Sequence, residues 1–304
     1  MGRRTAVQIQ FDKDCSAMLK AAAEAGFEHV SIGFGSYEGF VREGWQERIA
    51  ALRDEIAVLG LTCVMTHAPY YDLRISADVT IPAIDLSVSR CIEATAMLGA
   101  EIMAIHPRGC YVSGSPYEGS VKGFNLSGLM TDRPGGCFSD GIEELSRSVE
   151  LNVSYWKPFC ERAAELGVLV GVENLPRWPN WNMTFCSNDP GAHAEIIDCL
   201  GEGACGVWDF GHAYLTNQGD VGPLKRLGSR IKGLHVHDNK GVDDNHFIPF
   251  DGSMNWQEQM GALKETGFDG YITLELAYTC DKDIGGFLSH AHSAAVRLDE
   301  ILRS

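Results

Sequence analysis

Side chains that bind divalent metals or transfer protons recur at the ends of short apolar segments of the chain. They stand in the motifs Thr-His-Ala, Ile-His-Pro, Val-Glu-Asn, Trp-Asp-Phe-Gly-His, Leu-His-Val-His and Leu-Glu-Leu. The residues concerned are His67, His106, Glu173, Asp209, His212, His235, His237 and Glu275. Burying several carboxylates and imidazoles together is unfavourable unless a cation or a hydrogen-bond network compensates them. The set therefore predicts a site for Mn, Mg, Co or Zn, since its donors are oxygen and imidazole without thiolate.

Two further residues extend this pattern into a loop. Asp244 and His246 follow the segment that carries His235 and His237. An Asp-x-His pair in a loop is by itself more typical of a turn, but beside the other residues it is a candidate second metal centre. His235 and His237 share one strand face because strand side chains alternate with period two, and one of them can lie outside the ligand sphere.

Alternating strand-like and helical segments must position these residues. The predicted strands are residues 5–11, 29–34, 62–68, 101–107, 168–174, 205–212, 231–239 and 270–276. The predicted helices are residues 14–25, 44–59, 81–99, 140–166, 189–200, 221–228, 256–266 and 283–303. Eight βα units predict one (β/α)8 barrel domain over residues 1–304, with the site at the carboxyl ends of the strands. A doubly wound open sheet is the alternative, but no GxGxxG motif follows the first strand.

One long segment interrupts the βα rhythm after the fourth strand. Residues 109–139 are rich in Gly, Ser and aromatic side chains. A loop of this length in a compact domain predicts a lid over the barrel mouth, and a contact between copies in a homo-oligomer is the alternative. Aromatic walls suited to the apolar face of a sugar are predicted at Tyr70, Trp178, Trp181 and Trp256.

Composition narrows the classes of partner. The chain has 304 residues, of which 45% are hydrophobic and 22% charged, as is typical of a globular protein. Its 25 Lys and Arg against 41 Asp and Glu give a net charge of -16, which disfavours nucleic acid as a partner. No apolar run reaches the ~18 to 20 residues of a membrane span, and no secretory signal is apparent, so a cytoplasmic location is expected. The ten cysteines lack CxxC pairs, which predicts buried free thiols.

Taken together, the motifs at Glu173, Asp209, His212, His235 and Glu275 resemble those of the xylose isomerase-like TIM barrels over nearly the whole chain. This superfamily contains sugar isomerases and epimerases together with the endonuclease IV family (AP endonuclease family 2). Resemblance to the first branch implies that Glu173, Asp209, His235 and Glu275 hold one divalent ion, that the two glutamates are acid and base, and that His212 contacts the substrate. Resemblance to the second implies a trinuclear zinc site, to which His67, His106, Asp209, His212, Asp244 and His246 contribute.

The leading hypothesis is therefore a metal-dependent isomerase or epimerase of a sugar or sugar phosphate. Glu173 or Glu275 would remove the proton α to a carbonyl, the metal would stabilise the resulting enediolate, and return of the proton to another position would give the isomer or epimer. His67 and His106 would hold hydroxyls or a phosphate. The alternatives are a di- or trinuclear zinc phosphodiester hydrolase, a lyase or dehydratase that begins with the same proton abstraction, and a sugar-binding protein without turnover.

Overall fold

Eight parallel strands form the centre of the computed structural model, which describes residues 4–12, 14–69, 82–107, 109–111, 145–177, 183–278 and 283–304. The strand order is β10-β1-β2-β3-β4-β6-β8-β9, and a parallel bridge between Val236 and Leu274 joins the last strand to the first. The strands are β1 (Thr5–Gln10), β2 (His29–Gly33), β3 (Thr62–His67), β4 (Ile102–Ile105), β6 (Leu169–Glu173), β8 (Ala204–Asp209), β9 (Ile231–His235) and β10 (Ile272–Leu274). The predicted (β/α)8 barrel is thereby confirmed.

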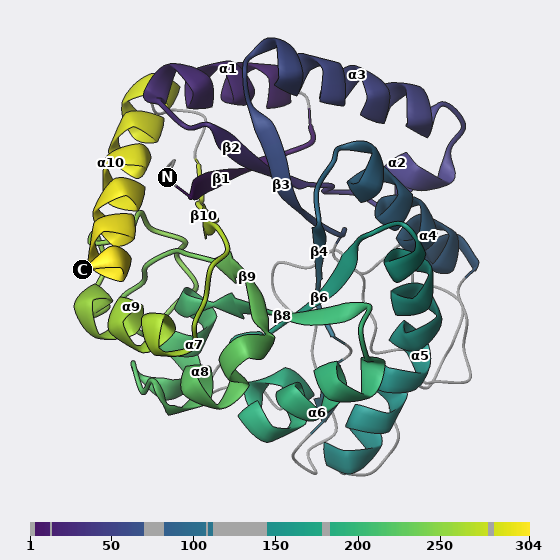
Figure 1. Cartoon of the computed structure of the whole chain (residues 1–304), viewed down its shortest axis with the longest axis vertical. Coiled ribbons are helices and arrows are strands. Elements are labelled where there is room, and N and C mark those ends of the chain that lie inside the picture. The colour runs from purple at the N-terminus through teal and green to yellow at the C-terminus, as the bar shows by residue number, and fades with distance from the viewer. Residues whose placement is uncertain are drawn as a thin grey trace.

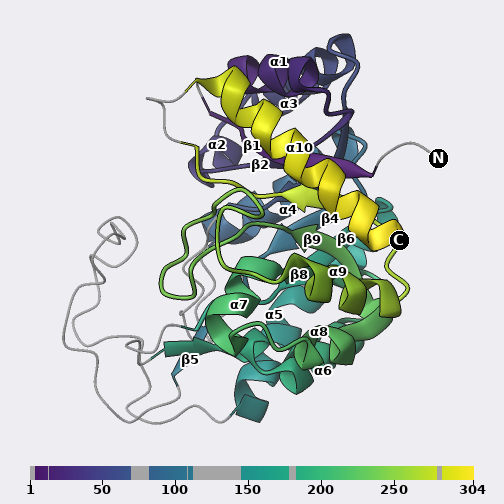
Figure 2. The same cartoon turned by 90° about the vertical axis from the view of Figure 1, so that its left-hand side faces the viewer.

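Helices surround this sheet on its outer side (Figure 1). They are α1 (Cys15–Ala25), α2 (Glu38–Val41), α3 (Trp45–Val58), α4 (Pro82–Met97), α5 (Leu145–Glu165), α6 (Pro190–Leu200), α7 (Phe210–Asn217), α8 (Gly222–Leu227), α9 (Trp256–Glu265) and α10 (Ile284–Arg303), with short 3-10 turns η2 (Cys186–Asn188) and η3 (Gly228–Arg230). In side view, the loop after β9 lies at the end of the barrel opposite the carboxyl end of α10 (Figure 2).

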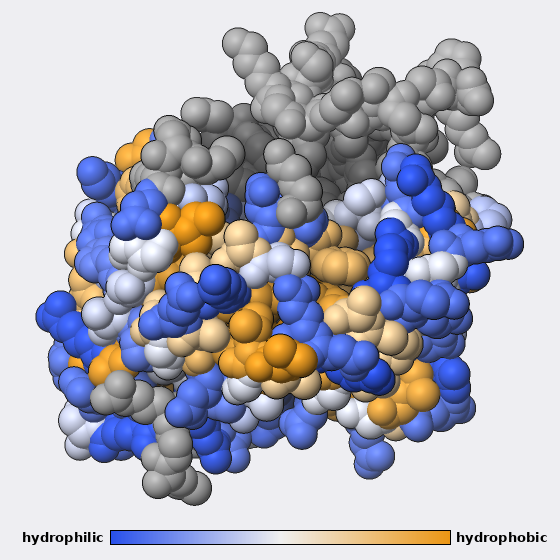
Figure 3. Space-filling model, turned by 90° about the horizontal axis from the view of Figure 1, so that it is seen from above, coloured by the Kyte–Doolittle hydropathy of each residue, from blue (hydrophilic) through white to orange (hydrophobic). Residues whose placement is uncertain are grey.

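The helices cover the barrel because their apolar residues recur with helical period. In α3, Trp45, Ile49, Leu52 and Ile56 are buried, and the residues between them are mostly exposed. Seen from outside, the face that carries α1 and α3 mixes hydrophilic residues with small apolar patches (Figure 3). Gly26 ends α1 in the left-handed conformation that glycine adopts without strain, with φ of 100°, which turns the chain back into β2.

Side chains from β3, β4 and β8 pack together inside the barrel. Met65, Ala104 and Val207 form a separate buried cluster there. Gly171 on β6 is required by this packing, since a Cβ would lie 2.5 Å from a methyl group of Val207. The larger core lies between the strands and the helices. The buried, free thiols of Cys15, Cys63, Cys91, Cys160, Cys186 and Cys205 belong to the interior, whereas Cys199 is exposed.

Several local features differ from the sequence prediction, among them the strand predicted at 231–239, which ends at His235, and α2, which was not predicted. The strand predicted for residues 205–212 ends at Asp209, and α7 begins at the next residue. The segment after β4 contains β5 (Gly109–Tyr111), which pairs antiparallel with β7 (Met183–Phe185). The rest of the predicted lid, residues 112–139, lies outside the described residues. Within the described part of the chain, no helix combines the length and apolar character needed to cross a membrane.

Candidate metal centre

Four predicted metal ligands meet at the carboxyl end of the barrel. Glu173, Asp209 and His235 end three consecutive strands of the sheet, and Glu275 follows β10. His235 Nδ1 lies 3.0 Å from Glu173 Oε1 and 3.6 Å from Glu275 Oε2. One donor atom from each of the four residues falls within 4.8 Å of all the others. We call Glu173, Asp209, His235 and Glu275 the inner group.

Glu173 is surrounded by imidazoles. Its carboxylate is completely buried, and Nε2 of His67 and Nε2 of His106 each lie 3.3 Å from its Oε2. His212 Nδ1 is 3.3 Å from its Oε1. Burial favours the neutral acid, but His235 and His106 outweigh this effect and lower the pKa of Glu173 well below its usual value. Burial also lowers the pKa of His106. The predicted residues His67 and His106 therefore lie beside the inner group.

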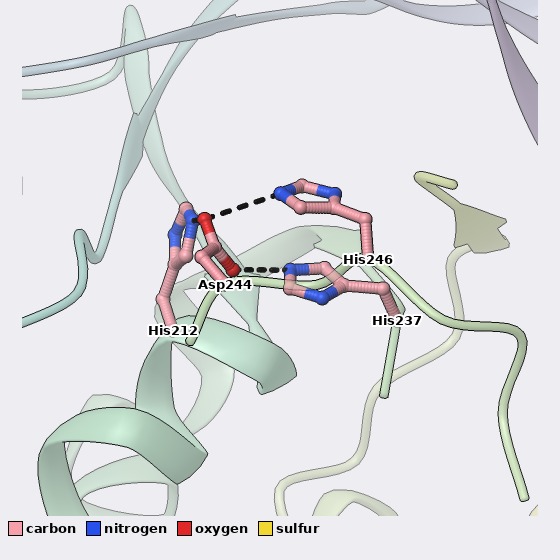
Figure 4. A group of neighbouring side chains, drawn as sticks. All are labelled: His212, His237, Asp244 and His246. Carbon is pink, nitrogen blue, oxygen red and sulfur yellow. Dashed lines mark hydrogen bonds and ion pairs between the residues drawn. The ribbon is translucent and has the colours of Figure 1, made fainter. Parts of the chain in front are cut away.

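A second set of polar side chains lies next to the first (Figure 4). Nε2 of His212 and Nε2 of His246 are both 3.2 Å from Asp244 Oδ2, and His237 Nε2 is 3.8 Å from Asp244 Oδ1. Donor atoms of these four residues also lie within 4.8 Å of one another. We call His212, His237, Asp244 and His246 the outer group. Asp209 adjoins both groups, because one of its oxygens lies 3.1 Å from His237 Nε2.

Backbone carbonyls fix the orientation of three imidazoles. Nδ1 of His67 is 2.6 Å from the carbonyl of Ala68, and Nδ1 of His212 is 2.9 Å from that of Asn174. His246 Nδ1 is 3.0 Å from the carbonyl of Glu275. A carbonyl only accepts hydrogen bonds, so each Nδ1 donates, and in the neutral ring Nε2 turns its lone pair toward a carboxylate. The Nε2 lone pair and the carboxylate oxygen are both hydrogen-bond acceptors. Their close approach is stable only when a proton or a cation lies between them.

The chemistry of these donors fits a divalent cation. Within the described residues, neither oxygen of Glu173 and neither ring nitrogen of His235 has a hydrogen-bond partner, although all four atoms are buried. Buried polar atoms are normally satisfied, and such exceptions require a reason. Carboxylates and neutral imidazoles at this spacing are ligands for Zn²⁺, Mn²⁺ and related ions. A bound ion would satisfy these atoms together.

Without a cation, protons must occupy part of the site. Burial lowers the pKa of His235, but Glu275 and Glu173 outweigh it and raise this pKa to about 9. Burial likewise opposes the charge of His246, whose hydrogen bond to Asp244 and proximity to Glu275 raise its pKa to about 9. Burial raises the pKa of Glu275, but His235 and His246 bring it down to about 2. Imidazolium and carboxylate charges therefore balance each other when no metal is bound.

Hydrogen bonds behind the two groups hold the backbone that presents them. The Asn174 side chain accepts from the Asp209 backbone N–H and donates to the Asp209 carbonyl, both at 2.8 Å. Asp209 Oδ1 accepts from the His212 backbone N–H at 2.6 Å and so caps the first turn of α7. Asp238 is fully buried, and its carboxylate accepts hydrogen bonds from the backbone N–H groups of Asn239, Phe250 and Met254 and from the indole of Trp256.

A cavity of about 320 Å³ opens above the inner group. Its polar lining includes the predicted residues His67, His106, His212, Asp244, His246 and Glu275. Gln8 and Gln10 also line it, and Gln8 Nε2 donates to Glu275 Oε1 at 2.6 Å. Neither amide is among the site residues predicted from the sequence. Their period-two spacing at the end of the first strand was the available signal, because it places both side chains on one face.

Of the four aromatic residues predicted to wall the site, Trp256 is the one within the described residues, and it does not line this cavity. Trp256 lies instead in the hydrophobic core at the start of α9, where only 2% of it is exposed. Its indole nitrogen donates to Asp238 at 2.8 Å, so its polar edge is satisfied away from the cavity. This corrects the sequence prediction for Trp256. Tyr70, Trp178 and Trp181 lie outside the described residues. Apolar lining comes from Phe34, Leu175, Pro176 and Phe185.

The sequence of the chain matches a known family and several individual proteins. The model of a family described as xylose isomerase-like TIM barrel matches residues 19–295. An uncharacterized protein of Methanocaldococcus jannaschii is 27% identical over 217 residues, which are 70% of this chain and 64% of that protein. An uncharacterized protein of Sinorhizobium fredii is 33% identical over 54% of each chain. Fructoselysine 3-epimerase of Escherichia coli O157:H7 is 27% identical over 38% of this chain and 42% of its own. The match thus spans less than two thirds of the length of each of these three proteins.

Solved structures agree with the fold. A D-tagatose 3-epimerase-like protein aligns with a TM-score of 0.65 at 21% identity, covering 98% of this chain and 97% of the other. D-psicose 3-epimerase from Clostridium cellulolyticum H10, determined with D-tagatose, gives a TM-score of 0.69 at 13% identity, covering 98% and 99%. At these identities the likeness establishes the barrel fold.

Proposed function

The chain belongs to the xylose isomerase-like TIM barrel family, and we propose that it is a divalent-metal-dependent isomerase or epimerase of a sugar or sugar phosphate. The main observation behind this proposal is that the carboxylates of Glu173 and Glu275 both lie close to His235 in the inner group and that Glu275 lines the cavity. The names of the relatives support this class of reaction, since fructoselysine 3-epimerase and the D-tagatose and D-psicose 3-epimerase structures are among them.

Glu173, Asp209, His235 and Glu275 would hold the cation, because they supply three carboxylates and one imidazole within bonding reach of one point. A divalent ion in this place supplies positive charge that acidifies the carbon next to a carbonyl and offsets the charge that develops on its oxygen. Mn, Mg, Co and Zn all accept such donors.

Glu275 is the stronger candidate for the proton-transfer base. It lines the cavity, whereas Glu173 is fully buried beneath it among imidazoles. The charges of His235 and His246 lower the pKa of Glu275 to about 2, so its carboxylate is ionised at neutral pH, the state in which a base must begin. Gln8 donates to one carboxylate oxygen and thereby orients the group. Glu173 would chiefly bind the cation.

Polar side chains around Glu275 suit a polyhydroxylated substrate. Gln8, Gln10, His67, His106 and His212 surround the cavity and offer both donors and acceptors for hydroxyl groups. A volume of about 320 Å³ is at the lower end of the usual range for small-molecule sites and is sufficient for a monosaccharide. We therefore propose a small carbohydrate as the substrate and the C–H bond beside its carbonyl as the reacting bond.

Solvent exchange tests this proposal directly. The Mn²⁺-loaded chain is incubated in D₂O with a panel of ketoses, aldoses and their phosphates, and NMR follows deuterium at the carbons next to the carbonyl. We expect incorporation and a new isomer or epimer with at least one member. Incorporation followed by loss of water would instead indicate the lyase or dehydratase alternative. A panel without any exchange in the metal-loaded protein would reject the isomerase and epimerase class.

A zinc-dependent phosphodiester hydrolase is the second candidate, favoured by the number of metal-binding side chains beyond the inner group. His67 and His106 approach Glu173, and the outer group lies alongside. Two or three zinc ions could be held by these residues and would stabilise both oxygens of a displacement at phosphorus. Hydrolysis of bis(p-nitrophenyl) phosphate by the zinc-loaded chain, without deuterium exchange on any sugar, would favour this candidate.

A further inference from the structure

Three buried polar atoms behind the inner group have no hydrogen-bond partner among the described residues. They are Ser187 Oγ, His193 Nδ1 and Trp208 Nε1. The three residues stand on different elements, η2, α6 and β8, and none of them is more than 3% exposed. Native proteins seldom leave a buried donor or acceptor unpaired, so three such atoms together require an explanation.

These three residues line the same small cavity. Its other lining residues come from the end of β6 and from α7, among others. The cavity lies outside the barrel, because Val207 belongs to the cluster inside the barrel and side chains alternate along a strand, so Trp208 points the other way. About 10 Å³ of this space is open to the centre of a water molecule. One buried water needs roughly 10 to 15 Å³ on this measure, so the size matches a single molecule.

The second nitrogen of His193 determines what its Nδ1 can do. Nε2 lies 2.9 Å from the Val172 carbonyl, which only accepts hydrogen bonds, so Nε2 carries the proton. Burial lowers the pKa of His193 from 6.5 to about 4, and the ring is therefore neutral at neutral pH. In the neutral ring, Nδ1 is an acceptor. It needs a donor from the direction of the cavity.

The other two atoms complement this acceptor. The indole nitrogen of Trp208 only donates, and the hydroxyl of Ser187 can donate or accept. A water molecule has two hydrogens and two lone pairs. It can accept from Trp208, donate to His193 and form a third hydrogen bond with Ser187, and about three hydrogen bonds are typical of buried water. A metal cation does not fit, because an indole N–H has no lone pair to offer it.

Neighbouring polar side chains already have partners of their own. The Asn174 side chain bonds at both ends to the backbone of Asp209. The Thr216 hydroxyl donates to the His212 carbonyl at 2.9 Å and accepts from the Arg177 backbone N–H at 3.0 Å. Neither residue can turn toward the cavity without giving up these bonds. A mobile molecule is a better partner than a rearranged side chain.

We propose that this cavity is a binding site for one water molecule, which accepts a hydrogen bond from Trp208, donates one to His193 and bonds to the hydroxyl of Ser187. The water joins η2, α6 and β8 directly behind the inner group, since Trp208 precedes Asp209 in the chain. This inference is independent of the reaction that the barrel mouth performs.

Nuclear magnetic resonance of the intact ¹⁵N-labelled chain tests the inference. A bound water gives cross-peaks of opposite sign in laboratory-frame and rotating-frame Overhauser spectra, whereas chemical exchange and passing solvent give the same sign in both. We expect opposite signs between water and the Trp208 indole N–H, whose signal Trp208→Phe identifies. The buried indole of Trp256 donates to Asp238 and is the matched control, for which we expect no such peaks. Their absence at Trp208 would overturn the proposal.

A double-mutant cycle tests whether two of the groups share the molecule. Ser187→Ala and Trp208→Phe each remove one partner of the water, and urea unfolding should show that each lowers the folding equilibrium constant by about 10-fold. Because the second change removes a partner from a water already weakened, the double variant should lose less than the ~100-fold product. Ser187→Ala combined with Ser289→Ala, on the exposed side of α10, should give the full product. A full product for Ser187 and Trp208 would mean that no water bridges them.

Discussion

The inner and outer groups contain similar residues but are built in different ways. The inner group stands on or directly after barrel strands, where register alone brings its members together: Asp209 pairs with His235, and Glu173 pairs with Val207. The outer group combines α7 with the loop between β9 and α9. It relies on features outside the strands, namely the left-handed backbone of His246, the contact of Gly211 with His237 and the buried Asp238. Similar ligand chemistry thus rests on a rigid sheet in one group and on a specific loop conformation in the other.

Both groups reach the cavity. Glu275 is the inner-group residue that lines it, and His212, Asp244 and His246 line it from the outer group. Strand ends hold reacting groups precisely because the hydrogen-bonded sheet cannot shift without breaking many bonds. A loop needs additional cross-links, and a metal ion is an effective one. The two groups should therefore respond differently to substitution, metal removal and pH.

The largest effect is expected at the inner group. Glu275→Gln keeps the shape of the side chain but removes the base and one negative charge from the cation site. We expect deuterium exchange on the substrate to fall by at least about 10³-fold, within the range for loss of a general base. Glu300→Gln, on the exposed side of α10, is the matched control and should retain full exchange. Normal exchange by folded Glu275→Gln would assign the base elsewhere.

Metal removal should increase the mobility of the outer group more than that of the inner group. Ligand binding at about 1,000 times its dissociation constant stabilises a protein by about 4 kcal/mol. EDTA treatment should therefore lower the melting temperature, and added Zn²⁺ should restore it. Hydrogen exchange should then show the larger loss of protection in residues 236–255, because the strands keep their ladder hydrogen bonds. Equal loss across the strands and this loop would mean that the loop is held as firmly as the strands without the metal.

A buried histidine outside both groups, His193, should make the stability of the protein depend on pH. His193 is fully buried, and its Nε2 lies 2.9 Å from the Val172 carbonyl. Burial lowers the pKa of His193 from 6.5 to about 4. Between these values the unfolded chain binds the proton and the folded chain does not, so stability falls as the pH decreases from 6.5 to 4, by about 3 kcal/mol in total.

Urea unfolding at several pH values measures this effect. The wild type should lose stability as the pH decreases from 6.5 to about 4. The glutamine of His193→Gln can still donate to the Val172 carbonyl but does not titrate, so this variant should lose about 3 kcal/mol less than the wild type over the same range. Identical pH profiles for the two proteins would mean that folding does not lower the pKa of His193.

The smallest of these effects concerns the support of the outer group. Asp238→Asn replaces one of two acceptor oxygens with an amide donor, which then faces N–H groups of Phe250 and Trp256 or of Asn239 and Met254. We expect a loss of about 2 kcal/mol in stability, the scale of an unsatisfied buried group. Zinc titration should show weaker binding by the outer group and unchanged binding by the inner group. An equal change in both would show that the two groups share one support.

Much of this architecture follows from local patterns. All eight predicted strands are present, because apolar segments that alternate with amphipathic helices are typical of a parallel barrel. His67, Glu173 and His235 could be assigned to one mouth, since the carboxyl ends of parallel strands meet there. Trp256 could not be placed, because its partner Asp238 is separated from it by a turn whose shape the sequence does not reveal.

The amino-acid sequence determined the barrel, the identity of the metal-binding side chains and the end of the barrel at which they gather, since these depend on periodicity and strand order. Only the tertiary structure decided how the side chains divide into two groups, that Glu275 rather than Glu173 faces the cavity, and that His237 fits because residue 211 lacks a side chain. The physical reason is that strand period is a local property, whereas ring stacking, carbonyl contacts and steric clearance arise between segments that meet only after the chain has folded.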